Sequence, residues 1–232
     1  MRIAIHQPQF MPWLGYFDKL DKVDLFVLLD NVQFKKNEYQ NRNRIKTHDH
    51  WIWLTVPVSF SFGDLVSGVQ INNQQDWRRK HLQTLLTYYG KAPCYREYQP
   101  AFAELYGGVG GSLADLNMAT IELIRKIFTI DTEIVRASDI PGLSEEPTAR
   151  LLDICRHFKA DTYLAGAGGK DYMECEKFKA AGLKLLFQNF VHPEYVQING
   201  PFIPCLSALD YIFNAGGDFS AIQRLNRELE VY

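Results

Sequence analysis

The sequence predicts an α/β protein with a mostly parallel sheet, flanking helices and a helical insertion in the middle of the chain. The first thirty residues place an amphipathic segment between two short apolar runs, which is the pattern of a β-α-β unit. The same alternation of strand and helix resumes at Glu133 and continues toward the C-terminus. Between these two regions of strand-helix alternation, residues 73–128 have mostly helical periodicity. We therefore expect a sheet whose strands come from both ends of the chain.

The composition is that of an ordinary globular protein and argues against DNA as a partner. The 232 residues are 47% hydrophobic and 22% charged, which is enough apolar material for a single domain over residues 1–232 with the helical segment inside it. The formal net charge of −2 provides no general attraction to DNA or to an anionic membrane. The oligomeric state does not follow from the sequence.

The N-terminus leads directly into a strand-like run, Met1 to His6, and lacks the pattern of a signal peptide. No apolar stretch reaches the roughly 18 to 20 residues that span a membrane. We therefore expect a cytoplasmic protein. The four cysteines form no C-x-x-C pair, so we expect free thiols with neither a disulfide nor a structural zinc.

Apolar runs and turn residues define the elements of the N-terminal half. Trp51–Val58 is rich in aromatic and β-branched residues, which favours a strand. The polar stretch from Asp30 to Asp49 is predicted to be a loop. In order, the expected elements are a strand at Ile3–Ile5, a helix at about Met11–Lys22, and strands at Leu25–Leu29, Trp51–Val58 and Leu65–Ile71.

Helical periodicity defines the middle of the chain, and strand-helix alternation defines the C-terminal half. Asn72 or Asn73 is expected to cap a helix that runs to about Tyr89. Gly216 and Gly217 are expected to end a late helix. The other expected helices are Arg96–Tyr106, Leu113–Phe128, Pro147–Phe158, one after Gly169, Leu206–Asn214 and Ala221–Leu229, and the expected strands are Glu133–Arg136, Thr162–Ala165 and Leu183–Phe187.

His6 and Gln7 stand at the end of the first strand, at the edge where open parallel sheets bind their ligands. Pro12 suits the first position of the next helix, whose free N–H groups would then face an anion beside Trp13 and Tyr16. We therefore predict that His6 is catalytic and that Gln7, Trp13 and Tyr16 bind the substrate. The alternatives stay open that His6 only hydrogen-bonds a turn and that the two aromatic rings belong to the core.

The segment Asn41–Lys46 places two guanidiniums and a lysine beside two amides. Such side chains bind phosphate, pyrophosphate or carboxylate groups, and we expect the basic ones to hold an anion while the amides orient hydroxyl or amide groups. A solvated turn is the alternative. The predicted substrate-binding residues of this region are Gln33, Asn41, Arg42, Asn43 and Lys46.

A glycine-rich turn, Gly166–Gly169, follows a buried strand and precedes a helix, so its amides are suited to cradle a ligand. Its spacing matches neither the P-loop nor the dinucleotide fingerprint. The alternative is a tight turn that requires positive φ, which explains the glycines but not the polar residues after them. The predicted substrate-binding residues here are Gly168, Gly169, Lys170, Asp171 and Tyr172.

A second histidine, His192, follows another predicted strand and reaches the same edge of the sheet. We predict His192 as a further catalytic candidate that shares a pocket with His6, and Tyr195 as a substrate-binding residue. No third ligand accompanies the two histidines at a recognisable spacing, so no metal site is predicted. The segments of His6, Arg42 and Lys170 are expected to converge on one pocket.

These segments, in this order, make the chain resemble the WbqC-like protein family: IAIHQPQFMPWLGYFDKL, DNVQF, NRNRIK, WLTVPV, YLAGAGGKDY, HPEYVQ and PFIPCLSALDYIFNAG. The resemblance covers nearly the whole chain. Members are associated with gene clusters for O-antigen, the outer part of lipopolysaccharide, and for other surface polysaccharides, and a glycine transferase role has been proposed for them. The resemblance therefore implies amide-forming transfer onto an amino sugar.

A fainter similarity concerns Phe10–Tyr16, which looks like a degenerate form of the phosphate-binding turn of nucleotidyltransferases and pantothenate-synthetase-like ligases. This similarity implies a Rossmann-like or nucleotidyltransferase-like fold and activation of a carboxylate through an adenylate, with ATP-magnesium as a candidate cofactor. The paired histidines of that turn are replaced here by Trp13 or Leu14 and by Tyr16.

The leading expectation is an acyl or aminoacyl transferase, or an amide-forming ligase. In it, His6 or His192 removes a proton from the amine of a nucleotide-linked amino sugar as that amine attacks an activated carbonyl. Arg42 and Lys46 hold a phosphate of donor or acceptor. The donor stays open between free glycine with ATP, aminoacyl-tRNA and an acyl thioester.

The alternative expectation, from a different class, is a non-catalytic protein that binds a nucleotide sugar or a glycan. Trp13, Tyr16 and Trp53 would then serve as stacking surfaces. The two expectations differ in whether the ligand is consumed: a transferase yields a product of changed mass, whereas a binding protein releases its ligand unchanged.

Overall fold

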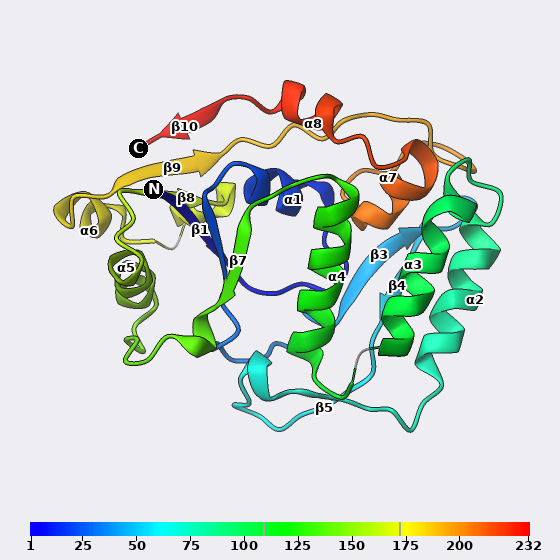
Figure 1. Cartoon of the computed structure of the whole chain (residues 1–232), viewed down its shortest axis with the longest axis horizontal. Coiled ribbons are helices and arrows are strands. Elements are labelled where there is room, and N and C mark those ends of the chain that lie inside the picture. The colour runs from blue at the N-terminus through cyan, green and yellow to red at the C-terminus, as the bar shows by residue number, and fades with distance from the viewer. Residues whose placement is uncertain (109, 172) are drawn as a thin grey trace.

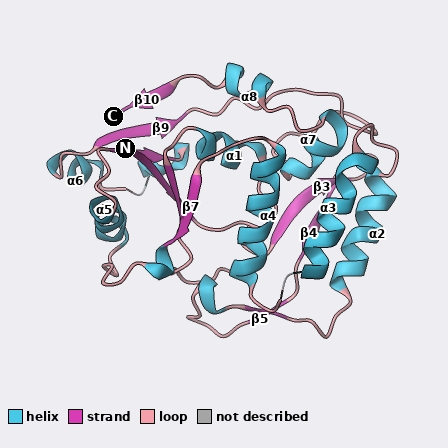
Figure 2. Cartoon of the chain, in the orientation of Figure 1, coloured by secondary structure: helices cyan, strands magenta, loops and turns pink. Residues whose placement is uncertain are grey.

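The structure is a computed structural model that describes residues 1–108, 110–171 and 173–232. In this part of the chain six strands form one sheet in the order β10-β9-β8-β1-β2-β7 (Figures 1 and 2). Neighbouring strands are parallel except β10, which pairs antiparallel with β9. The strands are β1 (Arg2–His6), β2 (Leu25–Leu28), β7 (Glu133–Arg136), β8 (Thr162–Ala165), β9 (Lys184–Gln188) and β10 (Leu229–Val231).

The predicted fold class, a mostly parallel sheet with flanking helices, is confirmed. Strand β1 lies between β2, which follows it in the chain, and β8, which comes from the C-terminal half. The connections that leave the carboxyl ends of β1 and β8 therefore run in opposite directions, toward β2 and toward β9. Such a switch point in strand order is where open α/β sheets bind ligands.

Helices cover both faces of the sheet, because alternate residues of each strand point to opposite sides. Ile3 and Ile5 of β1 join the apolar cluster under α5 (Pro147–His157) and α6 (Cys175–Ala180). Ala4 joins the cluster on the other face, with side chains of α1 (Leu14–Asp21) and α4 (Leu113–Ile127). That second cluster continues into the remaining helices.

The remaining elements lie mostly beyond α4. Helix α3 contacts α2, α4 and α7, and Figure 1 shows α2 and α3 at the end of the molecule away from α6. The bounds are β3 (Arg42–Lys46), β4 (Trp51–Thr55), β5 (Val58–Ser59), β6 (Gln70–Ile71), α2 (Trp77–Tyr89), α3 (Tyr95–Gly108), α7 (Ala208–Ala215), α8 (Ser220–Leu225), and the short 3-10 helices η1 (Val66–Gly68), η2 (Ala137–Asp139) and η3 (Ala167–Asp171).

The predicted loop before Asp49 is wrong, because part of it is strand β3, which pairs antiparallel with β4. The polar side chains of β3 alternate between two environments, and other parts of the protein cover them in both. Asn43 is buried, whereas the guanidinium of Arg42 lies 4.0 Å over the ring of Trp53, and that of Arg44 lies 5.2 Å over the ring of Trp51. Tryptophan faces on β4 thus bind two guanidiniums of the segment for which the sequence predicted an anion site, with a solvated turn as the alternative.

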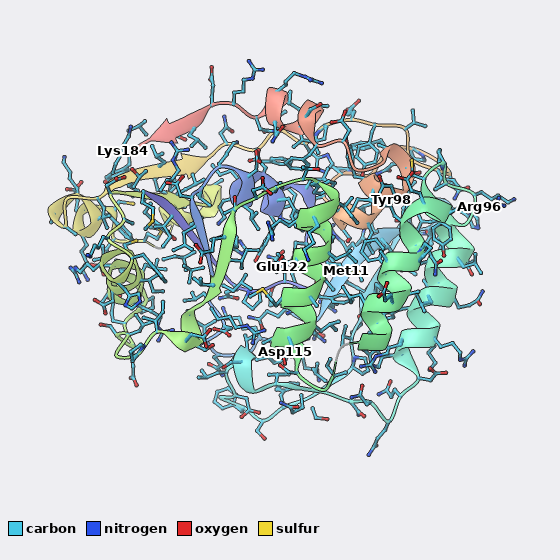
Figure 3. All side chains as sticks on the ribbon, viewed as in Figure 1. Met11, Arg96, Tyr98, Asp115, Glu122 and Lys184 are labelled. Atoms are coloured by element: carbon cyan, nitrogen blue, oxygen red, sulfur yellow. The ribbon has the colours of Figure 1, made fainter. Side chains whose placement is uncertain are left out.

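The first helix begins three residues later than expected, at Leu14, so Pro12 does not occupy its first position. Met11 has a φ of 44°, which breaks the helical path before Pro12. Met11 lies beside α4, where its N–H donates to Thr120 Oγ1 at 3.4 Å (Figure 3). The Pro12 carbonyl accepts from Ala208 N at 2.8 Å. Contacts with distant segments therefore hold these residues as a loop.

Three smaller expectations are also corrected. The N-cap of α2 is Asp76 rather than Asn72 or Asn73. The expected strand Trp51–Val58 is split at Pro57, which has no N–H for a ladder. The expected helix Ala221–Leu229 ends at Leu225, and its last residue begins β10.

No helix in the described residues has the length and hydropathy that crossing a membrane requires.

Gly15 is required because the indole of Trp13 lies against it. A Cβ on Gly15 would come within 2.3 Å of Trp13 Cη2. We expect Gly15→Ala to lower the free energy of unfolding by about 1–3 kcal/mol, because the indole or the helix must shift. Denaturant unfolding measures the change. Gly68→Ala is the control, since its Cβ meets no atom within 4 Å. Equal stability of the two variants would contradict this contact.

Candidate functional site

A cavity of about 590 Å³ opens at the carboxyl ends of β1, β2 and β8, at the switch point of the sheet. We call it the edge cavity. The polar residues and glycines that line it come from five segments of the chain: His6, Gln7 and Gln9 after β1, Lys19 on α1, Lys35 after β2, Arg150 on α5, and Gly166, Gly168 and Gly169 after β8.

His6 presents a neutral imidazole to the edge cavity. Its Nδ1 lies 3.0 Å from the Gln7 carbonyl oxygen, which can only accept, so we assign the proton of the neutral ring to Nδ1. Nε2 then carries a lone pair and has no hydrogen-bond partner in the described part of the chain. Burial, and secondly the charge of Lys19, lower the pKa of His6 to about 3. The ring is therefore a hydrogen-bond acceptor at any physiological pH.

Lys19 is the most unusual side chain of the edge cavity. It is 3% exposed, and among the described residues its Nζ has neither a hydrogen bond nor an ion pair. Burial lowers the pKa of Lys19 to about 7. Nζ lies beside Gly166, where a Cβ would stand 3.7 Å from it. A buried ammonium without a partner is costly, so its placement in a cavity points to an anionic ligand.

Two further cations face the same cavity. Arg150 is anchored by three backbone carbonyls: Nε donates to Ser144 O at 2.8 Å, Nη2 to Glu145 O at 3.1 Å, and Nη1 to Asn31 O at 3.3 Å. These carbonyls accept hydrogen bonds from the guanidinium. They carry no full negative charge, so they do not neutralise its positive charge. Lys35 is exposed at the rim. No aspartate or glutamate is among the described residues that line the cavity, so its electrostatic preference is for an anion.

The glycine turn after β8 forms one wall of the edge cavity. Gly169 N donates to Gly166 O at 2.9 Å. Neither these two residues nor Gly168 has positive φ, so backbone conformation does not explain the glycines. Close packing explains one of them, because a Cβ on Gly169 would lie 3.0 Å from Met173 Sδ and 3.2 Å from Ala165 Cβ. At Gly168 the space is open.

Of the polar residues after this turn, Lys170 is not part of the described lining of the cavity. Lys170 Nζ pairs with Glu230 at 2.5 Å and lies 5.1 Å over the ring of Phe187. The position of Tyr172 and the side chain of Asp171 fall outside the described part of the structure. Gln33 is exposed and forms a backbone bridge with Leu65.

The Asn41–Lys46 segment serves the hairpin and its neighbours rather than the edge cavity. Asn41 Nδ2 donates to Val56 O at 2.9 Å, and Asn43 Nδ2 donates to Met11 O at 2.8 Å. Lys46 Nζ donates to Pro201 O. Arg42 donates to Asn37, besides covering Trp53. Of the three segments expected to converge, the structure brings those of His6 and Gly166–Lys170 together and leaves Arg42 on the hairpin.

The second histidine lies in a different environment from His6. His192 is half-buried, its Nδ1 is 2.8 Å from Pro193 O, and its ring lies 5.7 Å from that of Phe202. Burial lowers its pKa. Tyr195 donates to Asp210 Oδ1 at 2.8 Å. The described lining of the edge cavity includes neither residue.

The two aromatic residues near the start of α1 differ from each other. Tyr16 is 1% exposed, and its ring lies 4.8 Å from that of His6, so it supports the histidine from the core. Trp13 is half-buried and lines a separate hollow. Within the described residues, no three His, Cys, Asp or Glu side chains gather closely enough to hold a metal ion.

Sequence reasoning missed Lys19, Lys35, Gln9 and Arg150. Lys19 carried one signal: it stands beside Asp18 on a short helix between two buried strands, where a charge needs a reason. Arg150 resembled any exposed helical arginine, because the loops that surround it are distant in sequence.

The family model and the similar protein that match this chain each extend over most of its length. The family model described as the WbqC-like protein family matches residues 7–221. An uncharacterized protein of Mycobacterium tuberculosis is 30% identical over 221 residues, which are 94% of this chain and 95% of that protein. No solved structure matches. The family match includes α1, which carries Lys19, and β8, after which the glycine turn lines the edge cavity, and the chain belongs to the WbqC-like protein family.

Proposed function

We propose that the protein is an acyl or aminoacyl transferase, or an amide-forming ligase, that acts on a nucleotide-linked amino sugar in the synthesis of O-antigen or another surface polysaccharide. One observation supports the proposal: the buried Lys19, which has no hydrogen bond or ion pair within the described part of the chain, lies with His6 in a cavity of cationic lining at the switch point of the sheet. Such a cavity offers an anion site and a proton acceptor side by side.

In the proposed reaction one bond to the carbonyl carbon forms, another bond to it breaks, and one proton moves from the amine to His6. The amine nitrogen of the sugar attacks the activated carbonyl carbon, and a nitrogen–carbon bond forms. The bond from that carbon to a phosphate oxygen or a thioester sulfur breaks, and the leaving group departs with the electron pair. His6 Nε2 accepts the proton that the nitrogen loses. A weak base suffices for this step, because the attacking nitrogen becomes strongly acidic once it carries a positive charge.

The cations have the complementary role in this proposal. Lys19 and Lys35 hold the phosphate groups of the substrate, and Arg150 adds positive charge from the side of α5. Gln7 and the open backbone at Gly168 face the same space and orient neutral polar groups. Charge in a largely water-excluded cavity stabilises a developing anion more strongly than it does in water.

A second function is supported by one observation. A pKa of about 3 makes His6 a poor base at neutral pH, which favours a non-catalytic nucleotide-sugar binding protein. Mass spectrometry separates the two. A transferase incubated with a uridine diphosphate-linked amino sugar and an activated glycine gives a heavier amide product, whereas a binding protein returns the sugar nucleotide unchanged.

Lys35 and Lys36 provide a matched test of the anion site. Both are exposed, but only Lys35 lines the edge cavity. We expect Lys35→Ala to weaken binding of the uridine diphosphate-linked amino sugar about tenfold, or ~1.4 kcal/mol, because a phosphate loses one cation. Isothermal titration calorimetry measures both variants. Equal affinities for Lys35→Ala and Lys36→Ala would place the phosphate elsewhere and remove the basis of the proposal.

A further inference from the structure

Two smaller hollows lie beside the edge cavity. One, of about 270 Å³, is lined by Gln9, Trp13, Tyr39, Arg44 and Cys205, and we call it the aromatic hollow. The other, of about 200 Å³, shares Gln7, Gln9 and Lys35 with the edge cavity, and Gln9 and Tyr39 with the aromatic hollow. Because neighbouring spaces share lining residues, the three lie next to one another, and we call them together the trench.

The aromatic hollow has polar atoms that the protein itself leaves unpaired. Gln9 Oε1 and Arg44 Nε are both buried and have no hydrogen-bond partner among the described residues. Arg44 is held in place by other contacts, since its Nη2 donates to Cys205 O at 2.9 Å and its guanidinium covers Trp51. Buried polar groups without partners are uncommon in folded proteins, so each calls for a specific explanation. A ligand in the hollow that Gln9 and Arg44 line would provide such an explanation.

Each of the two aromatic rings that line the hollow packs against a further aromatic ring. Trp13 lies edge-on to Phe190, with ring centroids 5.1 Å apart, and Tyr39 lies edge-on to Trp53 at 5.6 Å. Rings held in this way form a preorganised surface for another flat ring. Beside that surface lie the amide of Gln9 and the guanidinium of Arg44. A flat ring with a donor and an acceptor along one edge matches this arrangement, and a nucleobase is such a ring.

We infer that the trench binds one extended nucleoside diphosphate, with its base in the aromatic hollow and its phosphates at Lys35 and Lys19. The inference rests on the proposed function and makes it more specific, because it assigns the nucleotide half of the substrate to its own subsite. Gln9 lies at the junction of all three spaces. In this assignment the Gln9 amide and the Arg44 guanidinium, which line the aromatic hollow, bond the polar edge of the base.

The test compares inorganic pyrophosphate with uridine diphosphate and adenosine diphosphate by calorimetry. We expect at least one nucleoside diphosphate to bind the native protein ten times more tightly than pyrophosphate, because the base adds contacts. Arg44→Met is expected to abolish that gain without changing pyrophosphate affinity. Arg42→Met is the matched control on the same strand, since Arg42 covers Trp53 outside the trench, and it is expected to keep the gain.

Gln9→Met separates a ligand role from a structural one. An acceptor that lacks a partner contributes nothing to the fold through hydrogen bonding, so this variant is expected to unfold at the same temperature as the native protein, or higher. It is also expected to lose most of the gain from the base. A lower unfolding temperature together with unchanged nucleotide affinity would overturn the role given to Gln9.

The outcomes distinguish this inference from the proposed function. If pyrophosphate binds in a Lys19-dependent way but the nucleoside adds nothing, the base subsite is wrong and the anion site stands. If the gain is present but survives Arg44→Met, the base lies elsewhere and the inference fails. If neither pyrophosphate nor a nucleoside diphosphate binds, the proposed function fails, and the inference fails with it.

Discussion

Lys19→Met is expected to make the ligand-free protein more stable and to abolish its binding of pyrophosphate. Burial lowers the pKa of Lys19 from 10.5 to about 7, which corresponds to roughly 5 kcal/mol of unfavourable free energy for the charged form. Methionine fills nearly the same space without a charge. Part of this free energy is therefore recovered in the variant, and a gain of about 2–4 kcal/mol is expected at pH 6.

The sign of the pH dependence follows from the lowered pKa. Below pH 7 both the folded and the unfolded chain carry the charge, so the native protein bears the full cost. Between pH 7 and 10.5 the unfolded chain binds more protons, so the stability of the native protein rises with pH. The advantage of Lys19→Met therefore shrinks across this range. Affinity of the native protein for pyrophosphate falls as pH rises through 7, because the ammonium is lost.

Denaturant unfolding at pH 6 and pH 9, with calorimetry at pH 6, measures these effects. Lys22→Met is the control on the same helix. Lys22 Nζ pairs with the buried Asp18 at 2.9 Å, so its removal leaves a carboxylate with fewer partners and is expected to destabilise the fold. A Lys19→Met protein that is less stable than the native one, or that still binds pyrophosphate, would remove Lys19 from the site.

His6→Ala is expected to lower kcat by about 10²–10⁴-fold, the usual contribution of a proton-accepting side chain. With a pKa of about 3, His6 stays neutral throughout pH 5 to 8, so the loss is expected to be uniform across that range. Steady-state rates measured by product mass, over this pH range, give the result. A loss confined to one side of neutrality would mean that the variant disturbs a different titrating group.

His192→Ala is the comparison for His6. Its ring packs against Phe202 and is not part of the described lining of the edge cavity, so turnover is expected to stay near the native rate. Circular dichroism of both variants checks that they are folded. Native activity in His6→Ala together with a large loss in His192→Ala would reverse the assignment of the proton acceptor.

Much of the sheet was predictable, because its strands are short apolar runs bounded by turn residues. Thr162–Ala165 and Glu133–Arg136 were expected at the residues where they occur. Strand β3 was not, because its polar residues become compatible with a strand only when Trp51 and Trp53 lie beneath them. Local sequence does not contain that pairing.

The candidate site was predictable only where position in the sheet determines it. His6 and Gly168 follow buried strands, so their edge could be inferred. Lys19 could not be placed in the same cavity, since its burial depends on the turn at Gly166 far along the chain. Conversely, the sequence predicted Lys46 as an anion ligand. In the structure its ammonium donates to a backbone carbonyl and interacts electrostatically with Asp210.

Strand β10 has a consequence for solubility. It covers the outer edge of β9, whose Leu185, Leu186 and Phe187 are apolar, and the Lys170–Glu230 ion pair joins it to η3. Without it, the backbone groups of β9 would be open to pairing with a strand of a second molecule. The free edge of the sheet is then β10, which is only three residues long and carries Glu230, and short, charged edge strands disfavour edge-to-edge aggregation.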